Sequence, residues 1–315
     1  MIVSLASVKV YPSIEAFPGL KTAVVTIGTF DGVHAGHQQI IKRLLSLAKE
    51  TGGETVVLTF FPHPRMVLQP DDNDMKLITT MQEREELLRS YGIDHLIIQP
   101  FSKEFSRLSA VEFVRDVLVK QIGTKVLVIG YDHHFGRNRE GSYKDLEEMA
   151  PVYGFRLEEI TEKIINDVAV SSTKIRKALL AGDILEAQTL SAHDFSISGI
   201  VKHGEKIGTS LGFPTANIEV PEPYKLIPAN GIYAVTVEVE DAVYKGMLYI
   251  GNRPVFNGIM RVIEVNIFDF NSNLYGQRIK VNLKAFIRGD QMFENVDQLV
   301  EKMNDDKQSA TKMLS

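Results

Sequence analysis

A short apolar run, a glycine-containing turn and a helical repeat follow one another near the start of this 315-residue chain. Residues 23–27 (AVVTI) are typical of a buried strand, residues 28–37 (GTFDGVHAGH) form the turn, and apolar residues then recur with helical spacing up to Gly52. This order brings backbone N–H groups and the positive end of a helix to one point. His34 and His37 fall near one face of the first helical turn. The pattern predicts a phosphate site in which imidazoles donate to phosphoryl oxygens.

Two other interpretations of His34 and His37 compete with phosphate binding. Helix capping with surface polarity explains a single histidine well, but it explains the whole of residues 28–37 poorly. A metal site is the second alternative, and two histidines without a third ligand at a fitting spacing give it little support. Neither a Gly-Lys-Ser/Thr loop nor a Gly-x-Gly-x-x-Gly pattern follows the strand, so neither common nucleotide-binding loop is present.

The first part of the chain alternates strand and helix patterns. The expected strands are 22–28, 54–60, 94–99 and 125–130, and the expected helices are 36–51, 81–91, 109–121 and 143–153. Short apolar runs separated by amphipathic helices predict a parallel sheet covered on both faces. Ser109 and Glu112 have the spacing of a capping box and mark the start of helix 109–121.

Two further helices are expected at about 172–181 and 183–191, and after them the alternation of strand and helix patterns ends. Short strands separated by turn residues predict an antiparallel barrel or sandwich, with strands at 196–202, 232–239, 243–250, 261–270 and 278–286. Turns are expected at Asn230-Gly231, at Gly251-Asn252 and at 271–273. A last helix at about 295–304 precedes a tail, 305–315, that we expect to be frayed. We place the domain boundary within 182–196 and take the domains as 1–184 and 185–315.

Composition excludes several classes of protein. The chain has no cysteine, so it contains no disulfide, thiolate zinc site or cysteine nucleophile. The net charge of -5 gives no general attraction to nucleic acid. There is no apolar run near the roughly 20 residues of a membrane span, and the first residues lack the pattern of a secretory signal. We therefore expect a soluble cytoplasmic protein.

Three further loops of the α/β part carry unusual polar residues after expected strands, where open parallel sheets bind ligands. His63 lies between two prolines, which indicates either a rigid turn or a binding position. Asp132, in residues 130–137, is followed by two histidines, and its carboxylate and the two imidazoles are suited to ribose, a base or a metal. Residues 171–176 combine Ser171, Ser172, Thr173, Lys174 and Arg176 at a helix start. Cations are unfavourable at that end of a helix unless an anion binds there, so this segment is a second candidate anion site.

The second part contains one candidate metal segment and one candidate general base. Thr215 and Asn217 are two residues apart on an extended chain, so they project to the same side and could complete the shell of a phosphate-bound Mg²⁺. A plain loop entering a strand is the alternative. Glu264 lies on the polar face of an alternating strand, 261–268, where it is either solvent-facing or able to take a proton from an alcohol.

Several motifs together resemble the prokaryotic bifunctional riboflavin kinase/FMN adenylyltransferase family, also called FAD synthetase. Residues 28–37, 131–137 and 171–176 resemble its Rossmann-like nucleotidyltransferase module, which transfers AMP from ATP to FMN to give FAD and pyrophosphate. The resemblance implies a triphosphate site formed by residues of these segments: Gly28, Phe30, His34, Gly36, His37, Ser172, Thr173 and Arg176. It also implies nucleotide or flavin contacts for His63 and Asp132.

The later segments 208–217, 251–254, 261–270 and 274–276 resemble the riboflavin kinase module of the same family. This resemblance implies a small barrel with a terminal helix that phosphorylates the 5′-hydroxyl of riboflavin. It also implies these roles: metal and phosphate ligands Thr215 and Asn217, catalytic base Glu264, phosphate-loop glycines Gly208 and Gly212, and Arg288 near the flavin phosphate. Two departures stand near the flavin-binding motifs: Tyr249 replaces a smaller or polar residue, and Val255 replaces the usual threonine.

The expected activity is therefore a two-step conversion of riboflavin to FMN and then FAD, with Mg²⁺ as cofactor and ATP as phosphoryl and adenylyl donor. The expected partners are small molecules, without nucleic acid or membrane, and the expected assembly is a monomer or a weak homo-oligomer. Two alternatives from other classes are a different nucleotidyltransferase, such as a pantetheine-phosphate or nicotinate-nucleotide enzyme, and a flavin-binding regulator that has lost turnover.

Overall fold

The computed structural model describes residues 8–71, 75–131, 133–161, 170–204, 207–240, 242–255 and 258–315. The chain forms two compact units, which are described separately below. The first comprises Met1–Met75 and Met81–Val170, and the second comprises Lys76–Thr80 and Ser171–Ser315. In the described ranges, no helix has the length and apolarity needed to cross a membrane.

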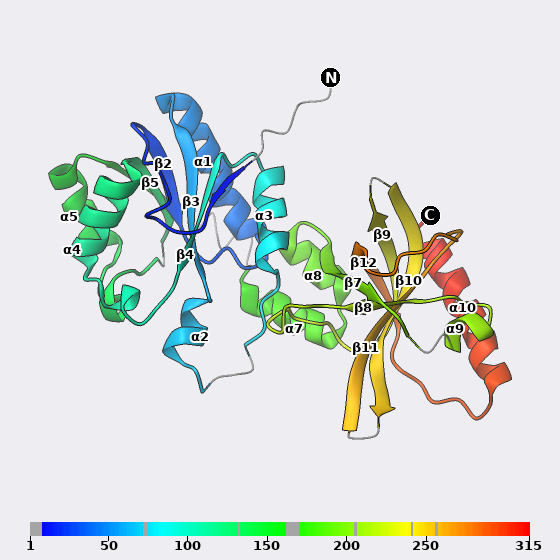
Figure 1. Ribbon diagram of the computed structural model, residues 1–315. Helices are drawn as coiled ribbons and strands as arrows, with labels where there is room; N and C mark the ends of the chain where they lie inside the picture. Colours follow the sequence, from blue (N-terminus) through cyan, green and yellow to red (C-terminus); the bar gives the residue numbers. More distant parts are fainter. Residues whose placement is uncertain are drawn as a thin grey trace. The chain divides into compact units, whose positions relative to one another are not determined.

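The first unit is built on a six-stranded parallel sheet (Figure 1). Its strands, in spatial order, are β1 (Lys9–Tyr11), β4 (His95–Pro100), β3 (Glu54–Phe61), β2 (Ala23–Ile27), β5 (Thr124–Gly130) and β6 (Arg156–Ile160). The predicted parallel sheet and its four strands are confirmed. The two edge strands β1 and β6 were not expected, because neither is a continuous apolar run: their side chains are mostly exposed or half-buried.

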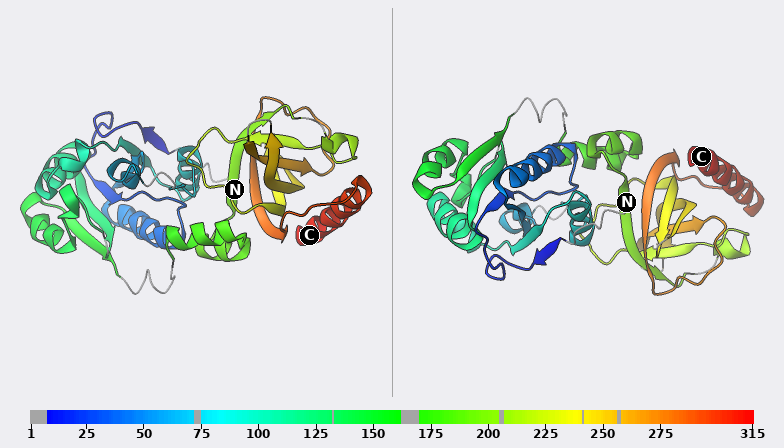
Figure 2. Two further views of the ribbon diagram at one scale, coloured as in Figure 1. Left: turned by 90° about the horizontal axis from the view of Figure 1, so that it is seen from below. Right: turned by 90° about the horizontal axis from the view of Figure 1, so that it is seen from above.

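Helices cover both faces of this sheet (Figures 1 and 2). Neighbouring strand residues point into different apolar clusters: Val24 packs with α1 (Ala35–Thr51) and α3 (Met81–Ser90), whereas Val25 packs with η2 (Phe113–Ile122) and α5 (Tyr143–Tyr153). The remaining short helices of the unit are α2 (Pro64–Leu68), η1 (Phe105–Arg107), α4 (Ala110–Glu112) and η3 (Arg137–Arg139). The capping box formed by Ser109 and Glu112 is present.

The strand order reverses between β2 and β5, which are neighbours in the sheet. From β2 the chain proceeds through β3 and β4 towards one edge, and from β5 it proceeds to β6 at the other edge. Parallel sheets bind ligands outside the carboxyl ends of the strands at such a reversal. The segment 28–34 after β2 and the segment that follows β5 from Tyr131 both begin at this point.

The second unit contains a closed antiparallel barrel, so the barrel alternative of the sequence-based expectation is confirmed. Its strands, in spatial order, are β10 (Ala242–Val255), β11 (Gly258–Ile267), β8 (Ala216–Glu219), β7 (Phe195–Lys202), β12 (Arg278–Arg288) and β9 (Gly231–Val239). Helices α7 (Ser172–Ala181), α8 (Ile184–Ser191), α9 (Ile207–Ser210) and α10 (Val296–Met313) complete the unit (Figure 1).

Two expectations for this unit were wrong. The tail 305–315 is not frayed, because α10 continues to Met313 and buries Asp306 and Ala310; Ala310 belongs to an apolar cluster that includes Phe213. Gly251-Asn252 is not a turn, because β10 runs through both residues. The glycine makes room within the strand: a Cβ on Gly251 would lie 2.0 Å from the hydroxyl oxygen of Tyr249.

A short segment from the first half of the chain, Lys76–Thr80, packs in the second unit. The backbone N–H of Leu77 donates to the carbonyl of Tyr224 at 2.7 Å, and the N–H of Leu226 donates to the carbonyl of Leu77 at 2.8 Å. Arg176 of α7 also donates from Nε to the carbonyl of Lys76 at 2.9 Å. Helix α7 therefore belongs to the barrel unit. The two compact units divide at Val170/Ser171, before the predicted domain boundary at 184/185, and that boundary stays a prediction.

Candidate active sites

The turn after β2 is held close to the sheet. The N–H of Gly28 donates to the carbonyl of Leu58 at 3.1 Å, which continues the pairing of β2 with β3. A Cβ on Gly28 would lie 3.1 Å from the ring of Phe30, so the glycine allows this ring to fold back over the backbone. Phe30 and Val33 have positive φ angles of 49° and 36°. Backbone conformations of this kind are rare outside glycine and persist where the surroundings hold them.

The two predicted phosphate-binding imidazoles lie together at the start of α1. His34 is the N-cap residue, and its Nδ1 accepts a hydrogen bond from the N–H of His37 at 3.4 Å. The two rings stack with centroids 3.7 Å apart, and the ring of Phe30 lies 4.8 Å from that of His37. The first turn of α1, which is fully described and includes Gly36, carries no acidic side chain. The positive end of the helix dipole is therefore available to an anion.

His37 has His34 and the guanidinium of Arg84 as its neighbours. Burial, the neighbouring His34 and the guanidinium of Arg84 all lower the pKa of His37 well below its ordinary value of 6.5. Its Nδ1 is buried and has no hydrogen-bond partner among the described residues. A buried polar atom without a partner calls for a ligand or an ordered water. This site can offer N–H groups and positive potential to a phosphate.

The other predicted residues of the first unit are His63, which follows β3, and Asp132. His63 caps α2, and its Nδ1 accepts from the N–H of Arg65 at 3.2 Å. Asp132 lies outside the described residues, so its predicted contact stays a prediction. The ring of His133 stacks on that of Phe135, with the ring centroids 6.2 Å apart, and Phe135 belongs to the apolar cluster that includes Val25.

The second candidate anion segment begins α7 in the barrel unit. Ser171 is the cap, and its hydroxyl accepts from the N–H of Lys174 at 3.3 Å. Ser172 and Thr173 follow in the first turn, and Arg176 donates to the carbonyl of Lys76. These residues and the His34–His37 pair belong to different units, so their sharing of one triphosphate stays a prediction.

The barrel brings three predicted kinase residues together. The hydroxyl of Thr215 donates to Oε2 of Glu264 at 3.1 Å. Asn217 pairs directly with Glu264 across β8 and β11, so both residues occupy the same position along the ladder. The amide of Asn266 donates to the carbonyl of Pro214 at 2.6 Å and fixes the chain that leads into Thr215. The carboxylate of Glu264, the hydroxyl of Thr215 and the amide of Asn217 thus lie together on one patch of the barrel.

Glycines make room beside this patch. A Cβ on Gly204 would lie 2.1 Å from Nδ2 of Asn217, and a Cβ on Gly208 would lie 3.1 Å from the hydroxyl of Thr215. Gly212 has a φ of 82° in the turn that follows α9. Side-chain oxygens such as those of Thr215 and Asn217 suit Mg²⁺, which keeps several waters and binds few protein ligands. In the described part of the chain, no group of three or more His, Asp or Glu side chains could hold a metal.

Arg288 has a partner that the sequence did not suggest. Its guanidinium forms a two-pronged ion pair with Asp306 of α10, with Nε–Oδ1 and Nη2–Oδ2 distances of 3.0 and 2.7 Å. Arg288 also lies over the ring of Phe293, at 5.7 Å from its centroid. The pair joins the end of β12 to the terminal helix, and the predicted contact of Arg288 with flavin phosphate stays a prediction.

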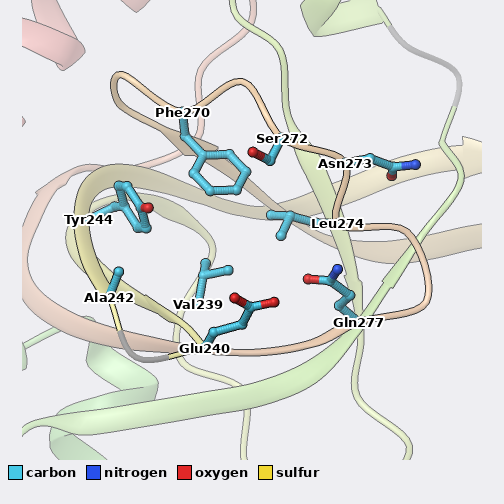
Figure 3. Close-up of a pocket in the computed structure, with 9 residues that line it drawn as sticks. All are labelled: Val239, Glu240, Ala242, Tyr244, Phe270, Ser272, Asn273, Leu274 and Gln277. Atoms are coloured by element: carbon cyan, nitrogen blue, oxygen red, sulfur yellow. The ribbon is translucent and has the colours of Figure 1, made fainter.

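A pocket of about 370 Å³ opens at one end of the barrel, between the β9–β10 hairpin and the segment that follows β11. Figure 3 shows the rings of Tyr244 and Phe270, the carboxylate of Glu240 and the amide of Gln277 around it. The carbonyl of Gln277 accepts from Val201 of β7 at 2.9 Å, and the next residue of β7, Lys202, pairs with Asn217. Gln277 of the pocket lining is therefore hydrogen-bonded to β7, and the lining combines two aromatic rings with polar side chains.

Comparison with known proteins assigns the same two modules. The FAD synthetase family model matches residues 18–174, and the riboflavin kinase model matches residues 191–314. The bifunctional riboflavin kinase/FMN adenylyltransferase of Buchnera aphidicola subsp. Schizaphis graminum is 38% identical, over 90% of this chain and 91% of its own length. The protein of the same name from Bacillus subtilis (strain 168) is 36% identical, over 93% of both chains.

A crystal structure from Streptococcus pneumoniae, described as a macrolide-efflux protein, has the same fold over nearly the whole chain. It superposes with a TM-score of 0.85 at 31% identity, over 97% of this chain and 99% of that one. The fold match, the order of the two family models and the full-length curated relatives agree. The chain therefore belongs to the bifunctional riboflavin kinase/FMN adenylyltransferase family.

Proposed function

We propose that the barrel unit transfers the γ-phosphoryl group of ATP to the 5′-hydroxyl of riboflavin, giving FMN and ADP. The convergence of Thr215, Asn217 and Glu264 carries this proposal. The carboxylate of Glu264 takes the proton of the attacking hydroxyl, the new O–P bond forms at the γ-phosphorus, and the bond to the β-phosphate oxygen breaks. In the free protein Glu264 accepts a hydrogen bond from Thr215, which fixes the orientation of the carboxylate.

The same patch would hold Mg²⁺ with the nucleotide. The hydroxyl of Thr215 and the side-chain oxygen of Asn217 are the proposed ligands. The glycines at 204 and 208 let the backbone pack directly against Asn217 and Thr215. When bound, the ion neutralises charge on the transferred phosphoryl group.

The α/β unit then transfers the adenylyl group of a second ATP to FMN. A phosphate oxygen of FMN attacks the α-phosphorus, the bond to the β-phosphate oxygen breaks, and pyrophosphate leaves. The stacked pair of His34 and His37 at the positive end of α1 supports this assignment. N–H groups of the turn and imidazoles donate to the oxygens that gain charge, so positioning and electrostatic stabilisation suffice without a covalent intermediate.

Product analysis tests both steps in one experiment. The purified protein, riboflavin, Mg²⁺ and ATP are mixed, and flavins are separated by chromatography over time. We expect FMN to appear first and FAD to follow, with ADP and pyrophosphate formed in step. Binding of riboflavin or FMN without turnover would instead indicate a flavin-binding regulator, and adenylylation of another phosphorylated acceptor would indicate a different nucleotidyltransferase.

We further propose that the protein acts on small molecules in the cytoplasm, as a monomer or weak homo-oligomer and without a nucleic-acid or membrane partner. The modest negative charge supports the absence of a nucleic-acid partner. Light scattering during size-exclusion chromatography tests the oligomeric state, and a stable oligomer at micromolar concentration would contradict it.

A further inference from the structure

Arg84 is one of the largest fully buried side chains of the described chain, although it is charged. It lies on α3, and its side chain is 1% exposed. Nη1 donates to the carbonyl of Thr29 at 2.7 Å, and Nη2 donates to Oδ1 of Asp31 at 3.4 Å. Burial of a guanidinium is costly unless hydrogen bonds and an opposite charge compensate it. Thr29 and Asp31, which accept these two hydrogen bonds, belong to the turn that leads into α1.

We propose that Arg84 is a positioning residue for adenylyl transfer, which fixes the turn at 29–31 and places a permanent positive charge beneath the anion site. This inference rests on the proposed adenylyltransferase function of the α/β unit. Arg84 acts through the turn and through the field at His37, and it does not itself contact the substrate.

The positioning part follows from where the two hydrogen bonds fall. Thr29 and Asp31 flank Phe30, whose φ of 49° is unfavourable for a residue with a side chain. Arg84 holds the carbonyl before Phe30 and the carboxylate after it, and the hydroxyl of Thr59 donates to the same carbonyl of Thr29 at 3.1 Å. The ring of Phe30 in turn contacts His37. Loss of Arg84 would therefore release the residue against which the imidazole packs.

The electrostatic part follows from the charges around His37. His34 faces it from the cap of α1 and Arg84 from α3, and the carboxylate of Asp31 lies beside Arg84. Burial, His34 and Arg84 together keep the pKa of His37 low, so this imidazole is neutral near pH 7. The guanidinium stays protonated at any ordinary pH. Arg84 thus carries its charge, paired with Asp31, whether or not His37 is protonated.

Three variants test the proposal: Arg84→Lys, Arg84→Met and the control Arg89→Met. Arg89 lies on the same helix, is partly exposed and pairs with Glu85, four residues away. The measurements are kcat and KM for conversion of supplied FMN to FAD between pH 6 and 9, the rate of FMN formation from riboflavin, and titration of His37 by NMR. We expect kcat/KM for adenylylation to fall about 100-fold in Arg84→Met and about 10-fold in Arg84→Lys, as for a misplaced catalytic group. FMN formation and Arg89→Met should stay at the wild-type level.

The NMR titration separates a charge effect from a packing effect. The pKa of His37 should rise in Arg84→Met, which lacks the charge, and should stay low in Arg84→Lys, which keeps it. A folded Arg84→Lys with wild-type kcat/KM and a folded Arg84→Met with an unchanged His37 titration would overturn the proposal. If circular dichroism shows that Arg84→Met does not fold, the kcat/KM of Arg84→Lys decides: a fall supports the proposal, and a wild-type value overturns it. Failure of the wild type to adenylylate FMN would refute the proposed function instead, which is a distinguishable result.

Discussion

The hydroxyl of Thr215 donates a 3.1 Å hydrogen bond to the carboxylate of Glu264 across 49 residues of chain. The contact exists because β8 and β11 are neighbours in the barrel and place Asn217 opposite Glu264. The proposed base and the proposed metal ligands are thus preassembled by the strand register, before any substrate binds. The register therefore fixes the kinase site as firmly as it fixes the barrel.

Replacement of Glu264 by glutamine should abolish FMN formation and spare FAD formation. The amide cannot accept the proton of riboflavin's hydroxyl, so kcat for the kinase step should fall by about 1,000-fold. Chromatography of products from riboflavin and, separately, from FMN measures the two steps. Glu219→Gln is the matched control, because Glu219 is an exposed carboxylate on β8 paired with Lys202. Equal loss of both activities in Glu264→Gln would contradict separate sites.

Replacement of His37 by alanine should have the opposite effect. Removal of one donor to the charged phosphoryl oxygens should lower kcat for adenylylation by about 100-fold, so FMN should accumulate from riboflavin. The same chromatography gives both rates. Lys42→Ala, at an exposed position of α1, should leave them unchanged. Normal FAD output from a folded His37→Ala protein would remove His37 from the site.

His37 should also make stability depend on pH. Its pKa is lowered well below 6.5 in the folded protein, so below pH 6.5 the unfolded chain binds a proton that the folded chain does not. The free energy of unfolding should therefore decrease as pH falls below about 6.5, and His37 should contribute no such dependence above it. Urea unfolding at several pH values measures this slope. His37→Gln should flatten it, and an identical slope in the variant would contradict the low pKa.

Lys225 should stabilise the barrel unit. It is buried, its Nζ donates to the carbonyl of Ile78 at 2.8 Å, and it lies 4.3 Å from the centroid of the Phe195 ring. Lys225→Met keeps most of the volume but leaves that carbonyl without this charged donor, so the free energy of unfolding should fall by about 2 kcal/mol. Thermal and urea unfolding measure the change, with the exposed Lys245→Met as control. A loss no greater than that of the control would show that the buried ammonium group contributes little.

Local patterns predicted most of the fold. Continuous apolar runs gave β2, β3, β4 and β5, and the capping box located the helix at Ser109. The patterns failed where tertiary contacts decide the outcome. Helix α10 continues past residue 304 because Asp306 meets Arg288 and Ala310 meets the apolar cluster of the barrel, and neither partner is near in sequence.

The candidate sites were likewise predicted only where local sequence indicates the chemistry. His34, His37, Thr215 and Asn217 lie in short segments whose residue types already indicate their chemistry. Arg84 lies on an otherwise ordinary amphipathic helix, and only the three-dimensional structure shows that it reaches the turn at 29–31. One sign of this role was present in the sequence: Arg84, next to Glu83, is a charged residue at a helix position that the apolar periodicity predicts to be buried.

The placement of Lys76–Thr80 has a consequence for any attempt to divide this enzyme. A kinase fragment that starts at Ser171 would lack the residues that bridge to 224–226, and Lys225 would lose its carbonyl acceptor. A fragment that ends at Val170 would carry the same apolar residues, Leu77 and Ile78, into water. A single cut of the polypeptide therefore damages whichever half it is meant to release, and clean excision of the kinase requires transplanting the short segment with it.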